Sequence, residues 1–128
     1  MRKQYHFRKS KEGLLAWDVH RLIDLANDVQ PCAVALSEIA EIDEPYWYDA
    51  EGPLPTCRNL IEHMRLVEAT DLGYPIILSP DGRVMDGMHR VAKALLAGQT
   101  SIMAVRLHTM PEPDYVGVNP DDLPYDDA

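Results

Sequence analysis

The stretch VMDGMHRVAKALLAG, Val84 to Gly98, has the pattern of a strand that ends in a tight turn and continues as a helix. Apolar residues recur at helical spacing after Gly87, and Gly98 is a typical helix terminator. His89 and Arg90 lie in the first turn of this predicted helix, off its apolar stripe. The helix dipole disfavours positive charge at that end. Two adjacent basic side chains there therefore need a physical explanation.

One explanation for the basic pair is an anion bound at the helix N-terminus. Backbone N–H groups of a first helical turn have no partner in the helix and bind phosphate well. Arg90 would supply a two-pronged donor, His89 a nearby donor or proton carrier, and Gly87 room for a ligand. The other explanation is structural: Asp86 caps the helix and pairs with Arg90, while His89 is exposed. The residues alone leave both explanations open.

Short strands flank this segment on both sides. The sequence YPIILSPDGRVM predicts a β-hairpin over residues 76–85, with its turn at Ser-Pro-Asp-Gly. Cys32–Leu36 and Ser101–Leu107 predict two more strands. Few short strands alternating with helices predict an α+β fold, in which a short mixed sheet packs against about three helices in a single domain.

Two further helices are expected upstream. Asp18 is positioned to cap a helix over Val19–Val29, and Thr56 to cap a second helix over Cys57–Ala69. The second helix has apolar residues at the spacing of one face, which predicts a buried stripe made of Cys57, Leu60, Ile61, Met64 and Val67.

The composition is that of an ordinary globular chain. It has 128 residues, 46% of them hydrophobic, which is enough for one domain with its own core. No apolar run approaches the ~20 residues of a membrane span. The basic N-terminus lacks the apolar stretch of a secretory signal, so the cytoplasm is the expected location. A net charge of −9 argues against broad nucleic-acid binding, which relies on Lys and Arg.

The two ends of the chain differ in charge. Residues 1–12 are basic, and residues 111–128 are acidic and rich in proline. Such ends either attract each other or are separately solvated, and we favour solvated ends. The predicted domain therefore spans 1–110, with a core at about 34–107 and a helical extension at 18–29, followed by an unstructured tail.

From about Val34 to Leu107 the chain resembles the ParB/sulfiredoxin superfamily. The matching features, in order, are VALSEI, YPIILS, PDGRV, MDGMHRVAKALLAG and SIMAVRL. The resemblance implies a small α+β fold that binds nucleotide phosphates at a box made of Asp86, Gly87, Met88, His89 and Arg90. Superfamily members include chromosome-partitioning proteins that bind CTP, sulfiredoxins that use ATP and a free-serine kinase that uses ADP. ATP, ADP or CTP, with Mg²⁺, is therefore the implied cofactor.

Two departures from the superfamily limit what can be carried over. Sulfiredoxins have a catalytic cysteine immediately before the His-Arg pair, where this chain has Met88, which argues against sulfiredoxin activity. Partitioning proteins continue into a helix-turn-helix region, which the acidic segment after Leu107 does not resemble. Specific centromere binding is therefore not expected.

The acidic and aromatic segment EIDEPYWY, 41–48, supplies the other candidate residues. A phosphotransferase needs a base for the acceptor hydroxyl and often carboxylates for Mg²⁺. The segment offers Glu41, Asp43 and Glu44. Kinase-type members of the superfamily use a glutamate from the early part of the fold, so the resemblance makes Glu44 the first candidate and Asp43 the second, with His89 as a further catalytic candidate. The alternative is that the acids only solvate a loop. Tyr46, Trp47 and Tyr48 either stack on a base or line a substrate pocket, or they anchor the loop.

These patterns predict a protein that binds a nucleotide or another phosphorylated small molecule. The leading hypothesis is a Mg²⁺-dependent phosphotransferase or nucleotide hydrolase acting on a small molecule. A non-catalytic nucleotide-sensing module, and a DNA-associated ParB-like accessory protein or nuclease, stand as alternatives. No membrane partner is expected, and a homodimer is a candidate assembly.

Overall fold

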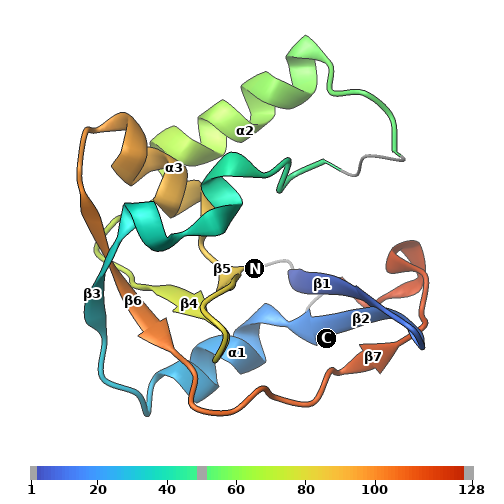
Figure 1. The fold of residues 1–128 in the computed structure, drawn as a ribbon. Helices are drawn as coiled ribbons and strands as arrows, with labels where there is room; N and C mark the ends of the chain where they lie inside the picture. Colours follow the sequence, from blue (N-terminus) through green and yellow to red (C-terminus); the bar gives the residue numbers. More distant parts are fainter. Residues whose placement is uncertain (1–2, 49–51, 126–128) are drawn as a thin grey trace.

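The computed structural model describes residues 3–48 and 52–125. Within them the chain forms two β-sheets and three α-helices, so the predicted α+β class is confirmed (Figure 1). One short mixed sheet was expected. The chain builds a second sheet because its N-terminal residues form a hairpin of their own. In the described part of the chain, no helix has both the length and the apolarity needed to span a membrane.

The main sheet has the strand order β3-β6-β4-β5. Its strands are β3 (Cys32–Ala35), β6 (Ser101–Arg106), β4 (Ile76–Leu78) and β5 (Val84–Asp86). β4 runs parallel to β6, and the other neighbours are antiparallel. The hairpin predicted over 76–85 is confirmed, since β4 pairs with β5 and Leu78 lies opposite Val84. Both predicted flanking strands, β3 and β6, are also present.

All three predicted α-helices are present, and the first two begin directly after their predicted capping residues. They are α1 (Val19–Ala26), α2 (Cys57–Ala69) and α3 (Met88–Leu96). The Asp18 side chain accepts a hydrogen bond from the His20 N–H, and Thr56 accepts one from the Asn59 N–H. α1 ends earlier than predicted, because the N–H of Asn27 closes the last turn and the chain then leaves the helix.

A second, three-stranded sheet joins the two ends of the chain. It has the order β1-β2-β7, from β1 (Tyr5–Ser10), β2 (Gly13–Asp18) and β7 (Tyr115–Val116). Gly13 occupies the β1–β2 turn at φ +105°, a conformation that glycine adopts without strain. The expectation of a solvated N-terminus is therefore wrong for the residues of this hairpin.

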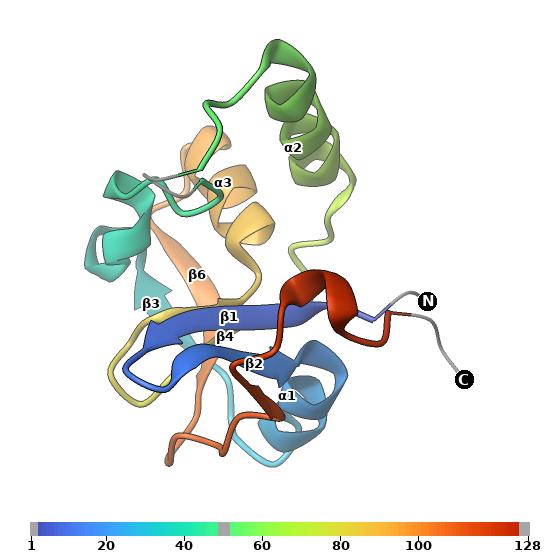
Figure 2. The same cartoon turned by 90° about the vertical axis from the view of Figure 1, so that its right-hand side faces the viewer.

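The acidic C-terminal segment is folded onto the same sheet (Figure 2). β7 pairs with β2, a short 3-10 helix η3 (Pro120–Asp122) follows, and Leu123 is buried. Trp17 Nε1 donates to the Pro111 carbonyl at 2.8 Å, and the Tyr5 hydroxyl donates to the Pro124 carbonyl. Residues 111–125 are therefore not the unstructured tail that was predicted; the last three residues lie outside the described part of the chain.

The main sheet separates two apolar clusters. Ile76 and Leu78 of β4 belong to the cluster under α3, and Ile77 between them belongs to the cluster under α1, as the alternation of a strand requires. Trp17 of β2 contributes to the second cluster, so the two sheets share a core. Two 3-10 turns, η1 (Leu36–Glu38) and η2 (Ala40–Asp43), carry Leu36 and Ile39 into the first cluster.

The predicted buried stripe of α2 is wrong. None of the residues of α2 is buried, and Cys57, Leu60, Ile61 and Met64 are exposed. The helix lies at the outer edge of the molecule, with α3 beside it (Figure 1). The spacing identified an apolar face correctly, but within the monomer that face has nothing to pack against.

Candidate functional site

The turn between β5 and α3 is set by Gly87. Gly87 occupies the cap position of α3 at φ +103°, in the left-handed region, and makes no side-chain capping bond. The prediction that Asp86 caps the helix is therefore wrong. A Cβ at Gly87 would lie 2.7 Å from both Arg90 Nη2 and Ile76 Cγ2. The backbone conformation and internal packing together account for glycine here, without a ligand.

Arg90 is held by internal contacts. Its Nη2 donates to Asp86 Oδ2 at 3.1 Å and to the Pro75 carbonyl at 3.3 Å. Its side chain is only 16% exposed and lines a cavity of about 320 Å³ beside α1. The structural explanation of the box thus holds for the Asp86–Arg90 pair, and Arg90 does not line the cavity into which His89 projects.

That cavity, of about 310 Å³, lies between β1 and the first turn of α3, and we call it the box cavity. Four of the five box residues line it, together with β1 and the segment after η2; its lining is Gln4, Tyr5, His6, Phe7, Val19, Tyr46, Trp47, Met85, Asp86, Gly87, Met88 and His89. A first helical turn supplies N–H donors, and the walls are largely aromatic. The volume is at the lower end of the range for small-molecule sites, about 300–1,000 Å³.

His89 is part of a stacked group of three rings on the wall of the box cavity. Its Nε2 lies 2.9 Å from His63 Nδ1 on α2, at hydrogen-bond distance. The Trp47 ring stacks on both imidazoles, with centroids 4.8 Å from His89 and 4.4 Å from His63. One imidazole must donate and the other accept, so at least one of the two facing nitrogens carries no proton. The alternative that His89 is simply exposed is therefore wrong.

Burial keeps both histidines neutral. It lowers the pKa of His89 below 6.5, and the nearby His63 and Arg90 lower it further, against the opposing effect of Asp86. Burial also lowers the pKa of His63, while Glu62 acts in the opposite direction. A cation is disfavoured in this position, so the pair is uncharged at neutral pH and one ring is available as a proton acceptor.

Trp47 emission is expected to report the titration of this pair. A protonated imidazole quenches the indole stacked on it, so the emission of Trp47 should fall with a midpoint below pH 6.5, in line with the lowered pKa of both rings. The measurement is a fluorescence pH titration of the wild type minus that of Trp47→Phe, which leaves only Trp17. A difference signal that is flat, or that has its midpoint above 6.5, would contradict the ring geometry.

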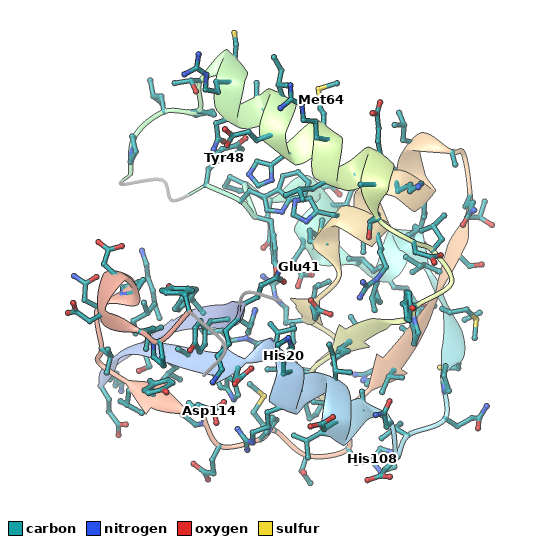
Figure 3. The ribbon with its side chains drawn as sticks, turned by 180° about the vertical axis from the view of Figure 1, so that it is seen from behind. His20, Glu41, Tyr48, Met64, His108 and Asp114 are labelled. Atoms are coloured by element: carbon teal, nitrogen blue, oxygen red, sulfur yellow. The ribbon has the colours of Figure 1, made fainter. Side chains whose placement is uncertain are left out.

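Glu44 and Asp43, the predicted base or metal ligands, do not line the box cavity. Both carboxylate oxygens of Glu44 accept from Arg83, at 2.6 and 2.9 Å, and this hydrogen bonding lowers the pKa of Glu44. Asp43 is exposed at the end of η2. The acid that points inward is Glu41, which is 2% exposed and accepts from the Val84 N–H (Figure 3).

A second cavity, of about 490 Å³, adjoins the box cavity and shares His6, Phe7 and Tyr46 with it. Its lining includes the basic residues Arg8, Lys9 and Arg83 together with Glu41, Glu44 and Asp81. We call it the charged cavity. Its charges are largely satisfied by each other: Arg8 Nη2, for example, donates to Ser79 Oγ at 3.0 Å, and Ser79 donates to Asp81.

The expected Mg²⁺ has no matching ligand group in the described residues. Nowhere in residues 3–48 and 52–125 do three or more His, Cys, Asp or Glu side chains converge as metal ligands would. Glu44 is occupied by Arg83, and Asp86 by Arg90. The side chains of this part of the chain therefore do not fit a protein-held Mg²⁺ centre.

Comparison with protein-family models, with curated proteins and with solved structures finds no match for this chain. The resemblance to the ParB/sulfiredoxin superfamily therefore stays a prediction from the motifs.

Two contributors to the site could not be found by sequence reasoning. His63 is 26 residues from His89 and reaches it only because α2 packs on α3. β1 provides one wall of the box cavity, although its charged sequence is typical of a solvated terminus. The aromatic segment of Trp47 marks it as a candidate, and the structure agrees with both alternatives for it, since Trp47 lines the box cavity and also packs against the first apolar cluster.

Proposed function

We propose that this protein binds a nucleotide or another phosphorylated small molecule in the box cavity. The observation that carries the proposal is the first turn of α3, which opens with Gly87, Met88 and His89 into a cavity of about 310 Å³ walled by aromatic rings. Backbone N–H groups at a helix N-terminus attract phosphate. Trp47 and Tyr46 offer flat apolar surfaces for a base or another ring.

The electrostatics of the box cavity favour a small anionic group over a long polyphosphate. Among residues 3–48 and 52–125 its lining contains no Lys or Arg, and the one carboxylate there, that of Asp86, is paired with Arg90. Phosphate would be held by helix N–H groups and by the imidazole of His89. The basic residues of the adjoining charged cavity lie where a longer phosphate chain would extend past His6 and Tyr46.

The test is calorimetric titration with inorganic phosphate, ATP, ADP, CTP and GTP, each with and without Mg²⁺, which binds nucleotide phosphates by itself. We expect one nucleotide to bind. His89→Asp should weaken it by about 100-fold, because a carboxylate beside phosphate is repulsive, while the helix gains a favourable charge at its N-terminus. His89→Asn should cost no more than about 10-fold.

The matched control is His108→Asp, which makes the same charge change at an exposed position remote from Glu41 and the box (Figure 3). It should leave the affinity unchanged. Equal loss of binding in both aspartate variants would mean that overall charge, and not the first turn of α3, governs the interaction. No binding of any probe by the folded wild type would refute the proposal.

Phosphate hydrolysis or transfer with His89 as general base is the second candidate function. It is favoured by the hydrogen bond between His63 and His89, because a neutral imidazole oriented by a second one suits proton abstraction from water or a hydroxyl. His63→Gln should then lower kcat more than it raises KM, since His63 would position the base without touching the ligand. Binding without turnover would instead favour the nucleotide-sensing module.

A further inference from the structure

α2 is attached to the rest of the molecule mainly by polar contacts. His63 reaches His89, and Lys93 Nζ donates to the carbonyls of Glu68 and Thr70 at 2.9 and 2.8 Å. None of the residues of α2 is buried. Helices of this length are marginal on their own in water and depend on packing of an apolar face. α2 has such a face, and the monomer leaves it uncovered.

The outer face of α2 consists of Cys57, Leu60, Ile61 and Met64. At about 100° per residue these side chains fall within an arc of about 100°. Asn59, His63 and Val67, the half-buried residues of the helix, lie outside that arc. Leu60 is 46%, Ile61 49% and Met64 61% exposed, and Met64 points away from the body of the molecule (Figure 3).

Apolar residues at both ends of α2 enlarge this surface. Leu54, just before α2, is 88% exposed, and Leu96, at the end of α3, is 81% exposed. With the outer face, these exposed side chains sum to on the order of 500 Å² of apolar area; the largest apolar patch of a soluble monomer is about 300–600 Å² and is often functional. A standard stable interface buries about 800 Å² per partner, which the polar margins of the helix would complete.

The charges of α2 suit pairing with an identical helix. The chain has a net charge of −9, so most of its surface repels a second copy. α2 instead carries as many basic as acidic side chains, leaving His63 aside: Arg58 and Arg65, and Glu62 and Glu68. Helical geometry places Arg58 and Glu68 on one flank of the outer face. In an antiparallel pair centred on residue 63, Arg58 of each copy comes opposite Glu68 of the other. A parallel pair would set like charges beside each other.

We propose that the outer face of α2 is the interface with a second copy of this chain, formed by antiparallel packing about a two-fold axis. Such an interface is isologous and closes as a dimer. Ile61 and Met64 lie at its centre, where truncation or charge has the largest effect. Ile61 and Met64 point about 160° and about 100° away from His63 around the helix, so changes at these two positions leave the contacts of His63 in place.

The first test is sedimentation equilibrium of the full chain over a range of concentrations. The wild type should dimerise, and Ile61→Glu/Met64→Glu should raise the dissociation constant by at least about 100-fold. Ile23→Glu on α1 and Met103→Glu on β6 are matched controls, because both side chains are similarly exposed, at 42% and 46%, and lie elsewhere. Circular dichroism checks that every variant is folded.

The second test addresses the antiparallel register. Arg58→Glu should weaken the dimer by placing a like charge opposite Glu68, and Arg58→Glu/Glu68→Arg should restore it, since the exchanged pair is again complementary. A monomeric wild type would overturn the proposal. So would dissociation by the control variants to the same extent, or failure of the charge exchange to restore association.

Discussion

Replacing Glu41 with alanine is expected to lower the free energy of unfolding by about 3 kcal/mol, the largest effect that we expect from a single polar side chain. Glu41 is 2% exposed, and one of its carboxylate oxygens accepts from the Val84 N–H while lying 3.6 Å from Arg83 Nε. The variant leaves a buried N–H of β5 without an acceptor and creates a cavity beside the first apolar cluster.

Two variants separate the contributions of Glu41. Glu41→Gln keeps an acceptor for Val84 and should cost less than about 1 kcal/mol, because the second carboxylate oxygen has no hydrogen-bond partner among the described residues. Glu44→Ala removes the exposed carboxylate that binds the same arginine and should also cost less than about 1 kcal/mol. Urea unfolding measures all three. Equal losses in the free energy of unfolding for Glu41→Ala and Glu44→Ala would show that the buried Glu41 contributes no more to stability than the exposed Glu44.

Acidification is expected to destabilise the protein through His6 by about 3 kcal/mol. Burial lowers the pKa of His6 from 6.5 to about 4, and the nearby Arg8 contributes. Between these values the unfolded chain binds a proton that the folded chain does not. The contribution is therefore fully present above pH 6.5 and is lost as the pH falls from 6.5 to about 4.

The control for His6 is glutamine at the same position. Arg8 Nε donates to His6 Nε2 at 2.9 Å, and the glutamine carbonyl can accept that bond without titrating. The difference in free energy of unfolding between wild type and His6→Gln, followed by urea unfolding from pH 7 to pH 4, should decline with acidity. A difference that is constant with pH would mean that His6 titrates normally in the folded protein.

The sequence was sufficient where local chemistry decides structure. Asp18 and Thr56 marked the starts of α1 and α2, and the Ser-Pro-Asp-Gly turn marked the hairpin of the main sheet. In each case the residues that make the interaction are within a few positions of one another. The class of fold followed from counting these elements.

The second sheet could not be predicted because its signals are weak locally. β1 carries Arg8 and Lys9, which are usual in a solvated terminus, and β7 is only two residues long. Both become strands by pairing with β2, across about 100 residues in the case of β7. Sequence patterns do not contain such long-range pairing, so the wall that β1 gives to the box cavity was missed.

The box presents the opposite difficulty for prediction, because residues that are adjacent in its sequence point to different sides of the helix. Arg90 and His89 are adjacent in sequence, but successive helical residues point about 100° apart. Arg90 turns toward Asp86 and the Pro75 carbonyl, while His89 turns toward Trp47 and His63. Periodicity placed both off the apolar stripe correctly, and only the tertiary structure decides which of them faces the cavity.

The most direct measurement of the central claim is a backbone amide NMR titration of the ¹⁵N-labelled protein with the tightest-binding nucleotide and with inorganic phosphate. Binding at the box cavity predicts the largest shifts at the amides of Met88 and His89 and at the indole N–H of Trp47. Shifts centred on Arg8 and Arg83 would move the site to the charged cavity. The absence of shifts at Met88 and His89, at Trp47 and around Arg8 and Arg83 would contradict the proposed phosphate binding. The first turn of α3 would then have a structural role alone.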